Sequence, residues 1–170
     1  MAIIGAGLGG LCLAQGLRRR GVAFEVYEKD PAINSRTQGY RFRLDGHGHH
    51  SLQKCLPPDL YQLVLATCAT PTSGGRFVDT ALNEVIGRAV DTWSSAETSD
   101  APEMPGDLSI NRSPLREKLL TDLTPRVHFG KALIEVSETD DYVFARFSDG
   151  TTVTADLLLA AEGVNSIVRQ

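Results

Sequence analysis

The sequence predicts an α/β fold, with a mostly parallel sheet into which antiparallel β-hairpins are inserted. Strand-like and helix-like segments alternate along the 170 residues, which is typical of a parallel sheet joined by helices. The first 28 residues alone give a strand, a glycine-rich turn, a helix and a second strand. Near the carboxyl end, Asp149-Gly150 lies between two strand-like segments and indicates a hairpin turn.

Composition places this fold in one ordinary globular domain. Hydrophobic residues make up 42% of the chain, charged residues 22%, and the formal net charge is −4. This charge provides no general attraction to phosphate, so we expect no nucleic-acid partner. The three cysteines are widely spaced and form neither a disulfide framework nor a zinc motif, so we expect no metal and a cytoplasmic location. Residues 1–17 are uncharged but rich in glycine, and basic residues follow them, so we expect no membrane span.

The amino end builds the first strand, helix and strand. Ala2–Ile4 is a short apolar strand, and apolar residues at helical spacing follow from about Gly9. Arg18–Arg20 lie in the last turn, where cations complement the carbonyl end of the helix dipole, and Gly21 ends the helix. Val22–Glu28 is almost continuously apolar, as expected of a parallel strand covered on both faces.

The middle of the chain is less regular. Alternating residues over Gly39–Asp45 predict a half-buried strand. The remaining expected segments are helices over Ser51–Leu56 and Asp59–Cys68, strands over Arg76–Thr80 and Glu84–Val90, and a loop over Asp91–Asp107.

The carboxyl part returns to the sheet. Leu108–Asn111 is an expected strand, and Ser113-Pro114 is expected to provide the N-cap and first residue of a helix that runs to about Leu123. Five strands should follow: Val127–Phe129, Ala132–Val136, Tyr142–Phe147, Thr151–Thr154 and Asp156–Ala161.

The glycine turn carries the strongest chemical signal. Gly5, Gly7 and Gly10 match the pattern GxGxxG between a strand and a helix, and Glu28 ends the next strand. These glycines permit a sharp turn, close approach of a pyrophosphate and tight helix–strand packing. An acidic residue at position 28 can accept both ribose hydroxyls of an adenosine and would repel a 2′-phosphate. A Rossmann-like site for FAD or NAD, in preference to NADP, is therefore expected; the alternative is a glycine turn and a solvated carboxylate without a ligand.

Two later segments favour FAD over NAD as the cofactor, because they resemble segments of a known family. The run from Ser109 to Leu120 resembles the strand, arginine and LxxxLL helix of class A FAD-dependent monooxygenases of the aromatic-hydroxylase type. The run from Asp156 to Arg169 is similar to that family's DLLVGADGxxSxVR element. Between them, Val127–Thr154 shows the hairpin spacing that ends in FxDGT. The resemblance covers nearly the whole chain.

The resemblance implies a set of cofactor contacts. Arg112 would contact the phosphate or ribitol part of FAD, or it would merely pair with a carboxylate. Gly163 would lie where backbone passes close to the pyrophosphate, next to Glu162, which replaces the aspartate usual in the family. Arg36 is similar to the family's arginine near the flavin. Lys29, beside Glu28, completes the expected set.

The same resemblance implies an activity. NAD(P)H would reduce the flavin, and one atom of O₂ would be delivered to a small, often aromatic, organic substrate in secondary metabolism. No catalytic residue is assigned, since the cofactor carries the reaction chemistry. Residues 1–170 are expected to be the amino-terminal part of an FAD-binding domain, with 40–107 a substrate-side insertion, ending before the family's substrate-binding sheet. A flavin reductase or dehydrogenase, and a non-catalytic dinucleotide-binding module or inactive fragment, remain alternatives, and homo-oligomerisation is left open.

Two further sets of residues invite a chemical role. His47, His49 and His50 lack carboxylate or thiolate partners at ligand spacing, so we interpret them as polar capping of the helix at Ser51. Cys12 lies close to the glycine turn, and packing between helix and sheet is favoured over nucleophilic work.

Overall fold

A four-stranded parallel sheet is the centre of the computed structural model, which describes residues 1–35, 40–69, 78–85, 106–164 and 166–169. The strand order is β5 (Val127–His128), β2 (Glu25–Tyr27), β1 (Ala2–Ile4) and β9 (Leu158–Ala160). β1 pairs in parallel with both β2 and β9, with Ile3 opposite Val26 on one side and Leu159 on the other. The predicted α/β fold with a parallel sheet is confirmed.

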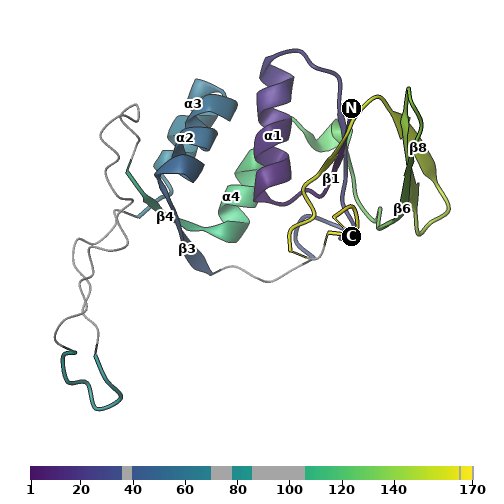
Figure 1. Ribbon diagram of the computed structural model, residues 1–170. Coiled ribbons are helices and arrows are strands. Elements are labelled where there is room, and N and C mark those ends of the chain that lie inside the picture. The colour runs from purple at the N-terminus through teal and green to yellow at the C-terminus, as the bar shows by residue number, and fades with distance from the viewer. Residues whose placement is uncertain (36–39, 70–77, 86–105, 165, 170) are drawn as a thin grey trace.

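An antiparallel sheet covers one face of this parallel sheet (Figure 1). It consists of β6 (Leu133–Glu138), β7 (Val143–Phe147) and β8 (Thr152–Ala155). The predicted hairpin turn joins β7 to β8: Gly150 has φ +84°, and its N–H donates to the Phe147 carbonyl at 3.0 Å. Every second side chain of β1 and β2 points toward this antiparallel sheet. The small core between the two sheets contains Ala2, Ile4, Tyr27, Leu133, Ala145 and Phe147.

Helices cover the opposite face. α1 (Leu8–Arg19) and α4 (Arg112–Leu119) lie next to the parallel sheet, and α2 (Gly46–Cys55) and α3 (Pro58–Leu65) lie beyond them (Figure 1). The larger core lies between the sheet and these helices. Ile3 and Val26, on the helix side of β1 and β2, pack in it with Leu11 of α1 and Leu115 of α4. A short 3₁₀ turn, Thr124–Arg126, then leads from α4 to β5.

Gln15 ties α1 to the end of α4. Its side chain is fully buried, and its Nε2 donates to the carbonyls of Leu119 and Thr121, both at 2.8 Å. The last carbonyls of a helix lack partners within the helix. The polar residue within the apolar amino-terminal stretch therefore serves to cap α4.

A separate two-stranded antiparallel sheet closes the middle segment. β3 (Arg41–Leu44) pairs with β4 (Leu108–Asn111), so the two ends of the expected insertion 40–107 meet. The predicted alternation over this strand is confirmed, with Phe42 and Leu44 half-buried and the intervening arginines exposed. The expectations for Arg76–Thr80, Glu84–Val90 and Asp91–Asp107 fall largely outside the described residues; within them, Val78 and Glu84 form an isolated bridge.

Several predicted boundaries were wrong. α2 begins at Gly46 instead of Ser51, because Asp45 accepts from the Gly48 N–H at 2.8 Å and starts the helix there. α4 begins at Arg112 with Asn111 as its N-cap, so Ser113 lies inside the first turn instead of before it. β2 covers only the end of Val22–Glu28. Among the described residues, no helix has the length and apolar character needed to cross a membrane.

Candidate functional site

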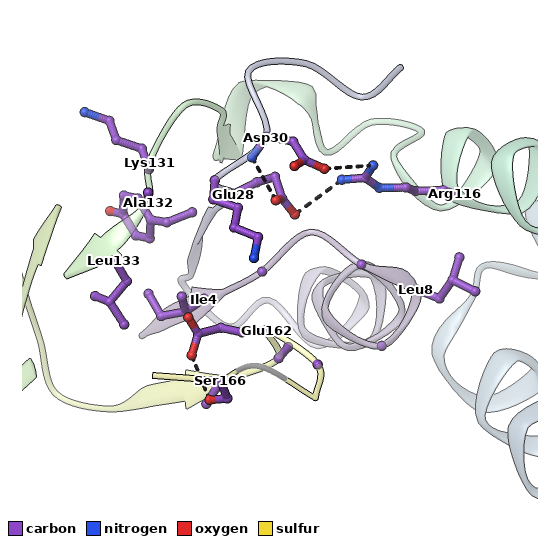
Figure 2. Close-up of a pocket in the computed structure, with 18 of the residues that line it drawn as sticks. Ile4, Leu8, Glu28, Asp30, Arg116, Lys131, Ala132, Leu133, Glu162 and Ser166 are labelled. Atoms are coloured by element: carbon purple, nitrogen blue, oxygen red, sulfur yellow. Dashed lines mark hydrogen bonds and ion pairs between the residues drawn. The ribbon is translucent and has the colours of Figure 1, made fainter. Parts of the chain in front are cut away.

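A cavity of about 1280 Å³ opens at the carboxyl ends of β1, β2 and β9. Ligands of open α/β sheets bind outside the carboxyl ends of the strands. Most of the predicted cofactor-contact residues line this cavity: Gly5, Gly7, Glu28, Lys29, Arg112, Glu162 and Gly163. Figure 2 shows Glu28 and Glu162 approaching it from two different strand ends. Gly10 lies beneath the turn and does not line the cavity, and Arg36 lies outside the described residues.

Gly5 and Gly10 make the turn compact. Gly5 has φ +105°, and a Cβ there would lie 2.5 Å from the carbonyl oxygen of Ala161. A Cβ on Gly10 would lie 2.0 Å from the carbonyl oxygen of Gly5. Real Cβ atoms do not approach backbone this closely, so both positions require glycine for packing. The expected sharp turn and close helix–strand approach are confirmed.

Gly7 has a different environment. It is the N-cap of α1 with φ −74°, which any residue can adopt, and a Cβ on it would meet no described atom within 4 Å. The open space beside Gly7 is therefore part of the cavity. The first N–H groups of α1 lack partners within the helix and carry its positive dipole end, which makes this position suited to an anion.

Glu28 lies at the end of β2 and is only 6% exposed. Its Oε2 accepts from the Ala6 N–H at 2.7 Å, and its Oε1 accepts from the Asp30 N–H at 3.0 Å. One carboxylate thus fixes the glycine turn and the start of the next loop together. Each carboxylate oxygen has two lone pairs, so Oε1, which accepts from one N–H among the described residues, retains an acceptor position for a ligand.

Arg116 is the most connected of the described site residues that the sequence did not predict. It projects from α4 and forms an ion pair with Glu28 at 3.3 Å and with Asp30 at 3.7 Å (Figure 2). Its Nε also donates to the carbonyl of Ala6 at 2.8 Å. Arg112, which was predicted, lies one helical turn earlier on the same element. Spacing of four residues places two side chains on one helix face, and that signal could have identified Arg116.

The turn after β9 forms the opposite wall. Gly163 has φ +83°, and a Cβ on it would meet no described atom within 4 Å. The Glu162 Oε2 accepts from the Ser166 hydroxyl at 2.8 Å (Figure 2). The same oxygen accepts from the Val168 N–H at 3.4 Å. In this structure the Glu162 carboxylate therefore holds its own turn together.

Basic side chains surround the cavity. Arg112 and Lys29 are exposed at its edge, and Lys131, which pairs with Asp149, lines it from the segment between β5 and β6. Arg116 lies deeper, with its charge shared by two carboxylates. A cavity with an unfilled glycine turn, a helix N-terminus and cationic edges has the features that bind a pyrophosphate-linked dinucleotide. The residues present therefore fit FAD.

The residues set aside earlier occupy structural positions. His49 lies inside α2, with Nδ1 2.6 Å from the Gly106 carbonyl oxygen and Nε2 2.7 Å from the Tyr61 hydroxyl, so the interpretation of the histidines as helix caps was wrong. Cys12 faces α2 instead of the sheet, and burial beside Cys55 raises the pKa of the Cys12 thiol to about 12. A thiol so poorly ionised is a weak nucleophile. In the described part of the chain, no group of three histidine, cysteine or acidic side chains could hold a metal.

Comparisons with known proteins agree with this geometry. Residues 3–62 match the family described as NAD(P)-binding Rossmann-like domain. The chain is 34% identical over 171 residues to a protein of Cercospora beticola named dual O-methyltransferase/FAD-dependent monooxygenase CTB3, covering 99% of this chain and 19% of that protein. It is 31% identical over 183 residues to 3-amino-4-hydroxybenzoate 2-monooxygenase of Streptomyces cremeus, covering 100% of this chain and 41% of the relative.

Solved structures extend the likeness to the fold. A protein of Photorhabdus luminescens, described as an FAD-containing monooxygenase, superposes with a TM-score of 0.80 at 28% identity. The match covers 99% of this chain and 40% of that one. The chain thus spans less than half the length of the relatives that it matches. In sequence and in fold, the chain is therefore similar to one part of FAD-dependent monooxygenases, and its residues 3–62 match a Rossmann-like dinucleotide-binding domain.

Proposed function

We propose that this chain binds FAD in the cavity at the strand ends and forms the flavin-binding part of an NAD(P)H-dependent monooxygenase. The substrate would be a small, aromatic organic molecule. The observation that carries the proposal is the open glycine turn at Gly7 beside the Glu28 carboxylate. Glycine without a packing requirement at a helix N-terminus leaves room for a phosphate where backbone donors are available.

The individual residues would divide the cofactor between them. The N–H groups that begin α1 would donate to the pyrophosphate, and Glu28 would accept from the adenosine ribose. Arg112 and Lys29 would neutralise phosphate charge from the edge of the cavity. Gly163 and Glu162 would approach the pyrophosphate from the turn after β9, and Arg36 would lie near the flavin. When bound, FAD would supply electron transfer from NAD(P)H to O₂, and the protein would orient it and exclude water.

The aromatic substrate and the reductant belong to the proposal as its finer parts. The Streptomyces cremeus relative is named as a monooxygenase of an aminohydroxybenzoate, and the family resemblance includes aromatic hydroxylases. These names support an aromatic ring bearing electron-donating groups as the substrate class. The other proposed partners are O₂ and NADH or NADPH.

The first test measures flavin retention. The purified protein would be mixed with FAD, freed of unbound ligand and examined by visible absorption, and we expect close to one equivalent of FAD. Arg112→Met should weaken binding by roughly ten- to a hundredfold, since one charge-assisted hydrogen bond to phosphate contributes about 1.5–3 kcal/mol. Arg146→Met is a matched control, because Arg146 pairs with Glu135 on the exposed antiparallel sheet. Loss of affinity in the control alone would count against the cavity as the site.

The second test separates the activities. Oxygen uptake with NADPH or NADH, in the presence of hydroxylated benzoates, is expected of a monooxygenase. A flavin reductase would oxidise the nicotinamide with an electron acceptor and without incorporating oxygen into a substrate. A protein that binds NAD⁺ and no FAD would instead be a nicotinamide-binding module, and that result would overturn the proposal.

A further inference from the structure

Arg116 connects four segments at the floor of the cavity. We propose that it is a positioning residue that fixes the Glu28 carboxylate for the adenosine ribose, and that it thereby sets the preference for ligands bearing the ribose 2′-hydroxyl. This inference rests on the proposed function, because it assumes a dinucleotide in the same cavity. It concerns selectivity, which is separable from binding itself.

The contacts of Arg116 come from distant parts of the chain. Its Nε donates to the Ala6 carbonyl at 2.8 Å, and its Nη1 donates to the Ile33 carbonyl at 3.2 Å. Its Nη2 lies 3.3 Å from the Glu28 Oε2, and the Nη1–Asp30 Oδ2 distance is 3.7 Å. The side chain is 12% exposed. A guanidinium is planar and rigid, so these acceptors together fix its orientation.

This arrangement leaves Glu28 one orientation. Its Oε2 receives both the Ala6 N–H and the Arg116 guanidinium. Its Oε1 receives the Asp30 N–H, and the remaining acceptor position on Oε1 is the one available to a ligand. A carboxylate held on both oxygens cannot rotate to follow a displaced hydroxyl. A site distinguishes a ligand with a hydroxyl from an analogue without it most strongly when the acceptor cannot move. The acceptor then has no partner when the analogue binds.

Charge explains why the guanidinium is needed. The Glu28 and Asp30 carboxylates are both largely buried, and Arg116 lies within 4 Å of each. Without a cation, two nearby carboxylates of low exposure would repel each other, and removing one partner of a buried pair leaves an uncompensated charge. This repulsion would weaken the hold of the Ala6 and Asp30 N–H groups on Glu28 and let its carboxylate leave the ribose position. Lysine is a poor substitute, because one ammonium cannot reach acceptors spread around a planar fork.

The experiment compares two ligands in the protein. FAD and its 2′-deoxyadenosine analogue would be titrated against wild type, Arg116→Met, Glu28→Gln and the double variant. We expect wild type to prefer FAD by roughly tenfold or more, the size of a hydrogen bond to a charged group. In Arg116→Met the preference for FAD over the analogue should fall to a value between about onefold and threefold, as in Glu28→Gln. The double variant should show no further fall, because both changes remove the same interaction. Arg146→Met should keep the wild-type ratio.

The outcomes distinguish this inference from the proposed function. If wild type binds no FAD, the proposed function fails and the inference with it. If wild type binds FAD and Arg116→Met weakens both ligands equally, Arg116 has only a structural role and the inference is overturned. If Arg116→Met changes neither affinity, the inference is also overturned, and the proposed FAD site stands. Should Arg116→Met not fold, Arg116→Gln keeps a donor for the Ala6 carbonyl and is subject to the same comparison.

Discussion

Two turns meet at the cavity, one after β1 and one after β9, and each contains a glycine with positive φ. Gly5 is enclosed, since a Cβ there would lie 2.5 Å from the carbonyl oxygen of Ala161, which itself precedes the second turn. Gly163 is open, since a Cβ on it would meet no described atom within 4 Å. The first turn is thus held by backbone packing together with the buried Glu28 carboxylate, and the second by the Glu162 side chain.

The difference separates two reasons for glycine in one site. At Gly5 and Gly10 a side chain would collide with backbone, so these positions determine stability. At Gly7 and Gly163 there is room for a side chain, and at Gly7 the backbone conformation also permits one. Stability and ligand affinity should therefore respond differently to the same substitution at different glycines.

The largest effect is expected for Gly10→Ala. The new Cβ would lie 2.0 Å from the Gly5 carbonyl oxygen, so helix and strand must move apart. Overpacking costs about 1–3 kcal/mol of the free energy of unfolding, and a contact this short with backbone places Gly10→Ala at the upper end of that range or above it. Gly9→Ala is the matched control: its Cβ meets no described atom within 4 Å, and alanine favours the helix by up to about 1 kcal/mol. Urea unfolding of both variants measures the difference, and equal midpoints would contradict the packing argument.

Gly7→Ala should separate affinity from stability. Alanine at this N-cap should lower the free energy of unfolding by less than about 1 kcal/mol. Its methyl group would occupy the place where a pyrophosphate approaches, so we expect FAD affinity to fall roughly thirtyfold, about 2 kcal/mol. Gly106→Ala is a control outside the cavity, since its Cβ also meets no described atom within 4 Å. If both variants bind FAD as wild type does, the pyrophosphate does not lie at Gly7.

Gly163→Ala should have a moderate effect on stability. A non-glycine residue at φ +83° costs about 1–2 kcal/mol, although the space is free. Asparagine tolerates this conformation better, so Gly163→Asn should lose less. Gly150→Ala tests the same conformational cost at φ +84° in the β7–β8 hairpin, away from the cavity. Both alanine variants should unfold more easily, and only Gly163→Ala should also change FAD affinity, as titration would show.

The sequence predicted the parts of this site that depend on local spacing. The glycines and Glu28 were found because a strand, a turn and a helix follow one another within 28 residues. Arg116 was missed because its partners lie 83 to 110 positions away in the chain. Side-chain contacts at such separations depend on how α4 packs against the glycine turn, and hydrophobic periodicity does not report that.

Helix boundaries show the same division. α1 was predicted closely, since its apolar residues repeat at helical spacing up to the terminal arginines. α2 was predicted too short, because its first residues include Gly46, Gly48 and three histidines, which have low helix propensity. The Asp45 cap and the packing of α2 against α1 and α3 outweigh that propensity. Tertiary context thus decided the start of this helix.

The smallest effect is expected at the turn after β9, for Ser166→Ala. This change removes the donor to Glu162 at 2.8 Å and should cost about 0.5–1.5 kcal/mol, the usual contribution of one hydrogen bond. Glu162→Gln keeps an acceptor and should cost less. The double variant should resemble Ser166→Ala alone, because one interaction is lost in both. Urea unfolding of the three variants tests this, and additive losses would mean that Ser166 and Glu162 stabilise the protein through separate contacts. A small loss here beside a large one at Gly10 would show that the turn after β9 can shift to meet a ligand while the turn after β1 cannot.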